Sequence, residues 1–185
     1  MGAPTLIYVT GPPGSGKTTL ARALGKHIPC PVIARDDIKL GLVHADGSRV
    51  PEWGGPVSRL THETFFSVLR LLLDGGVTVV ADAALQNDYW KPDVERLSKL
   101  ARVRVVHCTV DVDLARARII RREEESGAGR AGLVPSGQLL EALDSGTMTF
   151  EQFESITKIA PTLRVDTTDG YRPPIDQVLA FINDG

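Results

Sequence analysis

The chain has 185 residues, of which 42% are hydrophobic and 24% are charged, and its formal net charge is −2. These values are typical of one globular domain, which we expect to span residues 1–185, and they exclude a disordered or fibrous chain. The near-neutral charge, with no basic footprint, also disfavours long nucleic acids as partners.

Apolar runs rich in β-branched residues alternate along the chain with stretches of helical character. We expect strands at residues 6–9, 32–34, 77–81, 103–107 and 163–165. We expect helices at residues 17–28, 37–42, 57–74, 88–100, 112–125, 136–144 and 174–183. Continuous apolar strands separated by helices predict an α/β fold, with a parallel sheet covered by helices on both faces.

A glycine-rich motif lies between the first expected strand and the first expected helix. Residues 11–18 read GPPGSGKT, which fits every fixed position of G-x-x-x-x-G-K-[ST]. In such a loop the backbone N–H groups and the helix N-terminus bind phosphates, the lysine reaches the β/γ-phosphates and the hydroxyl binds Mg²⁺. We expect nucleotide contacts from Gly11, Pro13, Gly14, Ser15, Gly16, Lys17, Thr18 and Thr19, with Thr18 on the metal. The alternative is a ligand-free glycine-rich turn, which the flanking strand and helix disfavour.

A charged cluster, Arg35-Asp36-Asp37-Ile38-Lys39, follows the second expected strand. Ligands of open parallel sheets collect beyond the carboxyl ends of the strands, so this cluster is expected to face the γ-phosphate. Asp36 is then placed to accept the proton of an attacking hydroxyl, and Lys39 to bind an anionic group of the acceptor. The alternative is that Asp36 or Asp37 caps a short helix.

A further acid, Asp82, ends the apolar strand 77–81. At that point a carboxylate is suited to hold a Mg²⁺-bound water or to orient the acceptor. The alternative is an ordinary turn residue at the end of a strand.

Arginines gather on the expected helix 112–125. Arg118 and Arg122 are four residues apart and therefore share a face. A lid arginine is a common way to neutralise the charge that develops during phosphoryl transfer. We assign this role to Arg122, with Arg121 and Arg130 as competitors, and expect Arg118 to stack on the adenine or to hold the base of the lid. The alternative is a solvated face paired with neighbouring glutamates.

Two segments, residues 44–56 and residues 126–132, interrupt the alternation of strands and helices. Residues 44–56 read as a loop with turn formers, in which Trp53 either stacks on an acceptor or packs on the core. We expect an acceptor-binding insertion over about residues 44–74 and a lid over about residues 118–135.

Three ring-bearing residues are weaker candidates for the acceptor pocket. Tyr89 and Trp90 open a helix soon after Asp82 and suit a pocket wall. His62 shares a polar stripe with arginines and reads as a solvated histidine.

At these motifs the chain resembles the P-loop kinases related to polynucleotide 5′-hydroxyl kinase, a broad group that includes chloramphenicol phosphotransferase and the zeta toxins. The resemblance covers essentially the whole chain and implies a three-layer P-loop NTPase fold, with a five-stranded parallel sheet in the order 2-3-1-4-5 and an arginine-bearing lid. It implies Asp36 as general base, Lys39 on an acceptor phosphate, Arg122 as lid arginine and Thr167 beside the adenine. The chain departs from the polynucleotide kinase branch in residues 44–56 and in its near-neutral charge.

The sequence thus predicts an ATP- and Mg²⁺-dependent kinase that phosphorylates a hydroxyl of a small molecule. A 5′-hydroxyl kinase acting on RNA or DNA ends is the first alternative, and a non-catalytic ATP-binding regulator is the second. Asp36 disfavours the regulator, because hydrolysis needs a positioned water rather than an alcohol base. Cys30 and Cys108 form no CxxC pair, and no leader or membrane span is evident, so we expect a cytoplasmic protein with reduced, structural thiols.

Overall fold

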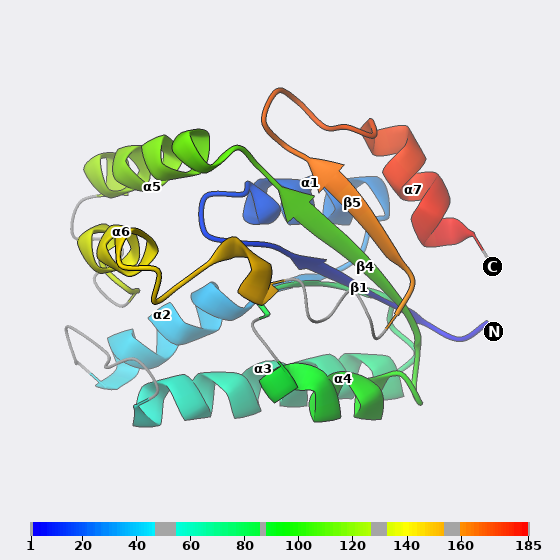
Figure 1. Cartoon of the computed structure of the whole chain (residues 1–185). Helices are drawn as coiled ribbons and strands as arrows, with labels where there is room; N and C mark the ends of the chain where they lie inside the picture. The colour runs from blue at the N-terminus through cyan, green and yellow to red at the C-terminus, as the bar shows by residue number, and fades with distance from the viewer. Residues whose placement is uncertain (1, 47–54, 86–87, 127–132, 154–159, 185) are drawn as a thin grey trace.

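The computed structural model describes residues 2–46, 55–85, 88–126, 133–153 and 160–184, and it has an α/β architecture (Figure 1). Its sheet consists of β1 (Thr5–Thr10), β2 (Val32–Ala34), β3 (Val79–Asp82), β4 (Arg102–Thr109) and β5 (Thr162–Asp166). The strands are all parallel and lie in the order β2-β3-β1-β4-β5. The expected fold class and strand order are therefore confirmed.

One or two α-helices follow each strand along the chain. They are α1 (Lys17–His27), α2 (Arg35–Asp46), α3 (Pro56–Asp74), α4 (Lys91–Leu97), α5 (Val112–Ser126), α6 (Ser136–Asp144) and α7 (Ile175–Asn183). The described residues also include the 3-10 turns η1 (Asp88–Trp90) and η3 (Phe150–Phe153). None of the helices in the described part of the chain is both long enough and apolar enough to cross a membrane.

The central strand β1 is buried along its whole length because helices cover both faces of the sheet. On one face Leu6 and Tyr8 pack with apolar residues of α3 and α4, among them Phe65 and Val94. On the other face Ile7 and Val9 pack with α1 and α7. Figure 1 shows these two helical layers on opposite sides of the strands. The fold thus has two main cores, one per face.

A third apolar cluster lies away from the sheet. It joins Ile119 of α5 to Leu139 and Ala142 of α6, together with Met148 and with Phe153 of η3. Figure 1 shows α5 and α6 side by side beyond the carboxyl ends of the strands. This cluster holds α6 and η3 against α5, at the edge of the sheet where ligands bind in such folds.

Two expected helix boundaries are wrong. The helix expected at 37–42 begins at Arg35 and continues to Asp46, so the expected loop at 44–56 is helical at its start. Two aspartates in its first turn suit the helix dipole, and no proline interrupts it. The helix expected at 88–100 is divided into η1 and α4, because Pro92, in the first turn of α4, has no N–H to continue the preceding turn.

Candidate active site

The glycine-rich loop connects β1 to α1. Gly11, Gly14 and Gly16 have φ values of 142°, 77° and 74°, in the region that favours glycine. A Cβ on Gly11 would lie 2.4 Å from the carbonyl oxygen of Cys108, and one on Gly14 would lie 2.5 Å from that of Ala115. Both the backbone conformation and the packing therefore require glycine, and the loop keeps the shape of a phosphate-binding cradle ahead of Lys17.

Asp82 meets the first turn of α1 at the end of β3. In the sheet it lies between Val9 of β1 and Ala34 of β2. Asp82 is 5% exposed, and its carboxylate accepts a hydrogen bond from the Thr18 hydroxyl. Burial raises the pKa of Asp82 above its ordinary value, although the Lys17 ammonium and the Thr18 hydroxyl act in the opposite direction.

The surroundings of Asp82 fit a magnesium ion. The Oδ1 atom of Asp82 is buried and has no hydrogen-bond partner among the described residues. The same part of the chain contains no cluster of three or more His, Cys, Asp or Glu residues that would form an all-protein metal site. One hydroxyl and one carboxylate beside a phosphate cradle are the donor set that Mg²⁺ uses when substrate phosphates and waters complete its coordination.

The two neighbouring aspartates of α2 face different surroundings. Asp36 is half-buried and lines a cavity that Lys17 also lines. Asp37 has a side chain that is 61% exposed and lies 3.8 Å from Arg22 in an ion pair on the surface. Only Asp36 therefore faces the phosphate-binding loop. Both residues belong to the first turn of α2, so the structure brings a helix start and a cavity-facing acid together.

The cavity has a volume of about 520 Å³ and is bordered by several elements of the fold. Pro13 and Lys17 come from the glycine-rich loop and α1, Arg122 from α5, and Arg35, Asp36 and Lys39 from α2. The remaining lining residues are Ser58, Arg59, His62, Ala84, Tyr89, Trp90, Leu133, Val134, Leu139, Met148 and Phe153. This size is ordinary for a small-molecule site. Trp53 lies outside the described residues, and Asp82 does not line the cavity.

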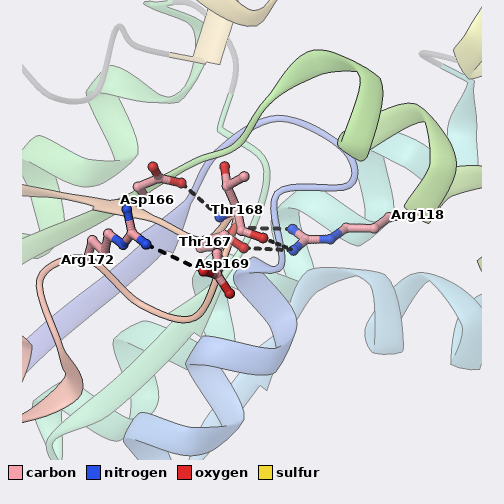
Figure 2. Close-up of polar contacts among 6 residues, drawn as sticks. All are labelled: Arg118, Asp166, Thr167, Thr168, Asp169 and Arg172. Atoms are coloured by element: carbon pink, nitrogen blue, oxygen red, sulfur yellow. Dashed lines mark hydrogen bonds and ion pairs between the residues drawn. The ribbon is translucent and has the colours of Figure 1, made fainter.

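Arg118 lies near the middle of α5 and joins this helix to the glycine-rich loop and to the loop after β5, whose residues Thr167 and Thr168 are shown in Figure 2. Its guanidinium donates hydrogen bonds to the carbonyl oxygens of Gly14 at 3.3 Å, Thr167 at 2.7 Å and Thr168 at 3.4 Å. It also donates to the Thr167 hydroxyl at 3.2 Å, which in turn donates to the carbonyl oxygen of Ser15 at 2.8 Å. These contacts anchor the middle of α5, and the two roles expected for Arg118, on the adenine or at the base of a lid, stay predictions.

The loop after β5 is fixed by its own polar contacts. Asp166 accepts a hydrogen bond from the Thr168 N–H at 2.8 Å, and Arg172 lies 3.4 Å from Asp169 (Figure 2). The hydrogen bonds from Thr168 lower the pKa of Asp166. Thr167 is thus held beside the glycine-rich loop, at the position expected to lie near the adenine.

The candidate lid arginines lie in different surroundings, one at the cavity and one on the surface. Arg122 lines the cavity, four residues after Arg118. Arg121 is 69% exposed and forms a surface ion pair with Glu125 at 3.6 Å. Arg130 lies outside the described residues.

The expectation of a solvated His62 is wrong. Its side chain is only 13% exposed, and its Nε2 lies 2.8 Å from Oδ2 of Asp93. Its ring packs 4.6 Å from Trp90 and 4.9 Å from Phe66, measured between centroids. The spacing of four residues between His62 and Phe66 on one helix was the sequence signal for this placement, because Phe66 belongs to the buried stripe of α3.

The chain matches one protein family by its sequence, and its fold resembles that of solved kinase structures. Residues 6–150 match the family AAA_33, an AAA domain. No curated protein matches the sequence. The structure is similar to that of a "putative kinase" from Chloroflexus aurantiacus J-10-fl, with a TM-score of 0.77 and 22% identity over 98% of this chain and 97% of that one.

Two more solved structures have the same fold. A sugar kinase from Janibacter sp. HTCC2649 has a TM-score of 0.67 and 14% identity over 98% of this chain and 95% of its own. Shikimate kinase from Acinetobacter baumannii, in complex with shikimate, has a TM-score of 0.55 and 20% identity over 96% and 90%. At these identities the likeness shows a common fold, that of P-loop kinases.

Proposed function

We propose that this chain, which belongs to the AAA_33 family of AAA domains, is a kinase that transfers the γ-phosphate of ATP to a hydroxyl group of a small molecule. One observation carries the proposal. Asp36, Lys17 and Arg122 line the same cavity, although they come from three different elements. A carboxylate, an ammonium and a guanidinium gathered at a phosphate-binding loop are the groups that phosphoryl transfer to an alcohol requires.

ATP binds with its phosphates in the glycine-rich loop between Gly11 and Gly16. Lys17 neutralises the β- and γ-phosphate oxygens, and Thr167 lies on the adenine side of the loop. Thr18 and Asp82 would hold Mg²⁺, which when bound neutralises phosphate charge and helps to orient the γ-phosphoryl group. The buried, unpartnered Oδ1 atom of Asp82 supports this assignment.

Asp36 acts as the general base. It accepts the proton of the acceptor hydroxyl as the acceptor oxygen forms a bond to the γ-phosphorus. The bond from that phosphorus to the β,γ-bridging oxygen breaks, and ADP leaves. Arg122 neutralises the charge that spreads over the γ-phosphoryl oxygens during this step. Lys39 contacts the acceptor from α2, and we retain Trp53 of residues 44–56 as a further acceptor contact.

The test uses two adjacent aspartates as a matched pair. The Asp36→Asn variant keeps the shape of the side chain but lacks a base, so we expect phosphoryl transfer to fall by about 10²–10⁴-fold with Mg·ATP affinity unchanged. Asp37→Asn serves as the control, because Asp37 pairs with Arg22 on the surface. ADP release is measured against a panel of hydroxyl compounds, and ATP binding by calorimetry. Equal activity of wild type and Asp36→Asn would refute the role of Asp36.

The basic lining of the cavity also suits the 5′ end of a nucleic acid, and this is the second candidate function. Lys39 and Arg59 would then contact phosphates of the polymer. Incubation with labelled ATP and oligonucleotides that carry 5′-hydroxyl ends tests it directly. Label transfer to the oligonucleotide would favour this function, and the lack of transfer would remove it. A protein that binds ATP but phosphorylates neither class would be a regulator.

A further inference from the structure

Two basic side chains of α2 reach the cavity, and no carboxylate among the described residues forms an ion pair with either of them. Arg35 and Lys39 are four residues apart, and both line the cavity. Lys39 is 4% exposed, and it forms no hydrogen bond or ion pair with the residues that the structure describes. The Nε atom of Arg35 is buried, and within the same described ranges it also has no hydrogen-bond partner.

Burying unpaired cations is unfavourable, so their retention points to a ligand that supplies the missing charge. Burial lowers the pKa of both groups, and the Arg35 guanidinium lowers that of Lys39 further. Asp36 opposes these shifts, but one carboxylate does not neutralise two cations. In the proposed reaction that carboxylate also faces the acceptor hydroxyl. An oxyanion from outside the chain is the remaining complement.

Arg35 is held in place by an aromatic ring rather than by a carboxylate. Its guanidinium carbon lies 5.4 Å from the centroid of the Trp90 ring. Trp90 is itself buried and packs on His62, which is hydrogen-bonded to Asp93. A contact with the face of a ring fixes the guanidinium and leaves its N–H donors in the plane for a bidentate ligand. Arg35 is therefore prepared to bind an oxyanion.

The wall contributed by the segment after the lid is apolar. Every described residue of 133–153 that lines the cavity is Leu, Val, Met or Phe, and Leu139, Met148 and Phe153 belong to the third apolar cluster. A polyol against this wall would lose its water without gaining hydrogen bonds, at about 1–3 kcal/mol for each unpaired hydroxyl. An apolar ring would lose no hydrogen bonds to water at this wall, and binding would be favoured by the burial of its apolar surface.

We infer that the acceptor is a compact hydroxylated acid, with a carboxylate or phosphate bound between Arg35 and Lys39 and an apolar, ring-sized body against Leu139, Met148 and Phe153. This inference rests on the proposed function, because it names the acceptor class of the same cavity. It predicts that neutral sugars and open-chain polyols are not substrates.

The test measures binding separately from turnover. The full chain, saturated with Mg·ADP, is titrated by calorimetry with 4-(hydroxymethyl)benzoate, with 4-(hydroxymethyl)phenyl phosphate, with the neutral 4-(hydroxymethyl)benzamide, and with gluconate. We expect the two ring acids to bind, in an order that identifies carboxylate or phosphate as the preferred oxyanion. We expect the amide and gluconate to bind on the order of 100-fold more weakly, since the first lacks the charge and the second lacks the apolar body.

Variants of both walls complete the test. Lys39→Met should weaken ring-acid binding on the order of 100-fold and leave Mg·ATP affinity unchanged. Leu139→Gln should weaken the ring acids but not gluconate, and its far-ultraviolet circular dichroism checks that it folds. The inference is overturned if the amide binds as tightly as the acid, if gluconate matches the ring acids, or if Lys39→Met has no effect. If a ring acid binds in this Lys39-dependent way but is not phosphorylated from ATP, the ligand class stands and the proposed kinase activity fails.

Discussion

Replacement of Lys39 by methionine tests whether a buried cation is maintained at the expense of stability. Lys39 is 4% exposed and is not paired with a carboxylate in the described part of the chain. Methionine has a similar length and no charge, so the variant removes the desolvated ammonium and keeps the packing of the stem. Replacing buried charges by apolar side chains of similar volume stabilises proteins by about 1–4 kcal/mol in favourable cases.

The nearby Asp36 already offsets part of the desolvation of Lys39, so we take the lower half of that range, about 1–2 kcal/mol. In a chain of this size 1 kcal/mol shifts Tm by roughly 2–4 °C, so 1–2 kcal/mol gives an expected rise of roughly 2–8 °C. Differential scanning calorimetry of the two proteins measures the shift. The control is Lys26→Met on the exposed side of α1, which should change stability by no more than about 0.5 kcal/mol.

The pH dependence of this difference follows from the direction of the pKa shift. Burial lowers the pKa of folded Lys39 below the ordinary value of 10.5. Between the folded pKa and 10.5 the unfolded chain therefore binds more protons at this position than the folded chain does, and the stability of the wild type rises with pH. The Tm advantage of Lys39→Met should therefore shrink as the pH is raised toward 10.5. A variant that melts no higher than wild type, or by a margin independent of pH, would refute the reasoning.

Two further substitutions test the nucleotide-binding loop and the contacts of Arg118. Gly11→Ala places a Cβ 2.4 Å from a carbonyl oxygen at a φ of +142°, so we expect a loss of more than about 2 kcal/mol and of nucleotide binding. Gly41→Ala, which meets only open space in α2, should instead gain about 0.5–1 kcal/mol, and equal melting of the two variants would contradict the packing argument. Arg118→Lys should weaken Mg·ATP binding by roughly 10-fold, because one ammonium cannot reach all the oxygens that the guanidinium joins. Arg70→Lys on the surface of α3 should leave calorimetric affinity unchanged, and parallel behaviour of both variants would remove the special role of Arg118.

The features that the sequence predicts well are those that depend only on residues adjacent in the chain. The glycine-rich loop is one continuous segment whose residue types determine its backbone, and the apolar strands need only their own composition to be recognised. The separate fates of Asp36 and Asp37 were also within reach, because consecutive residues of a helix cannot face the same way. These local rules account for the sheet and for the phosphate-binding side of the cavity.

The acceptor side depends on contacts between distant segments, which periodicity does not reveal. The side chain of His62 is largely covered because Asp93 and Trp90, about 30 residues later, pack against α3. The apolar wall arises because Phe153 and Met148 fold back onto α5. The end of α2 also differs from the expected one. Val43 is buried, and its packing extends the helix past residue 42, where propensity alone would end it.

The apolar cluster of α5, α6 and η3 lines the cavity but is separate from the two cores that pack on the sheet. Its members Ile119, Leu139 and Phe153 pack with one another and belong to neither of the two clusters that hold the sheet together. Under the proposed function, substitutions in this cluster would change acceptor binding and leave the packing of the sheet and of the glycine-rich loop unchanged. Acceptor preference could therefore evolve through single substitutions in this cluster, without loss of the residues proposed for phosphoryl transfer.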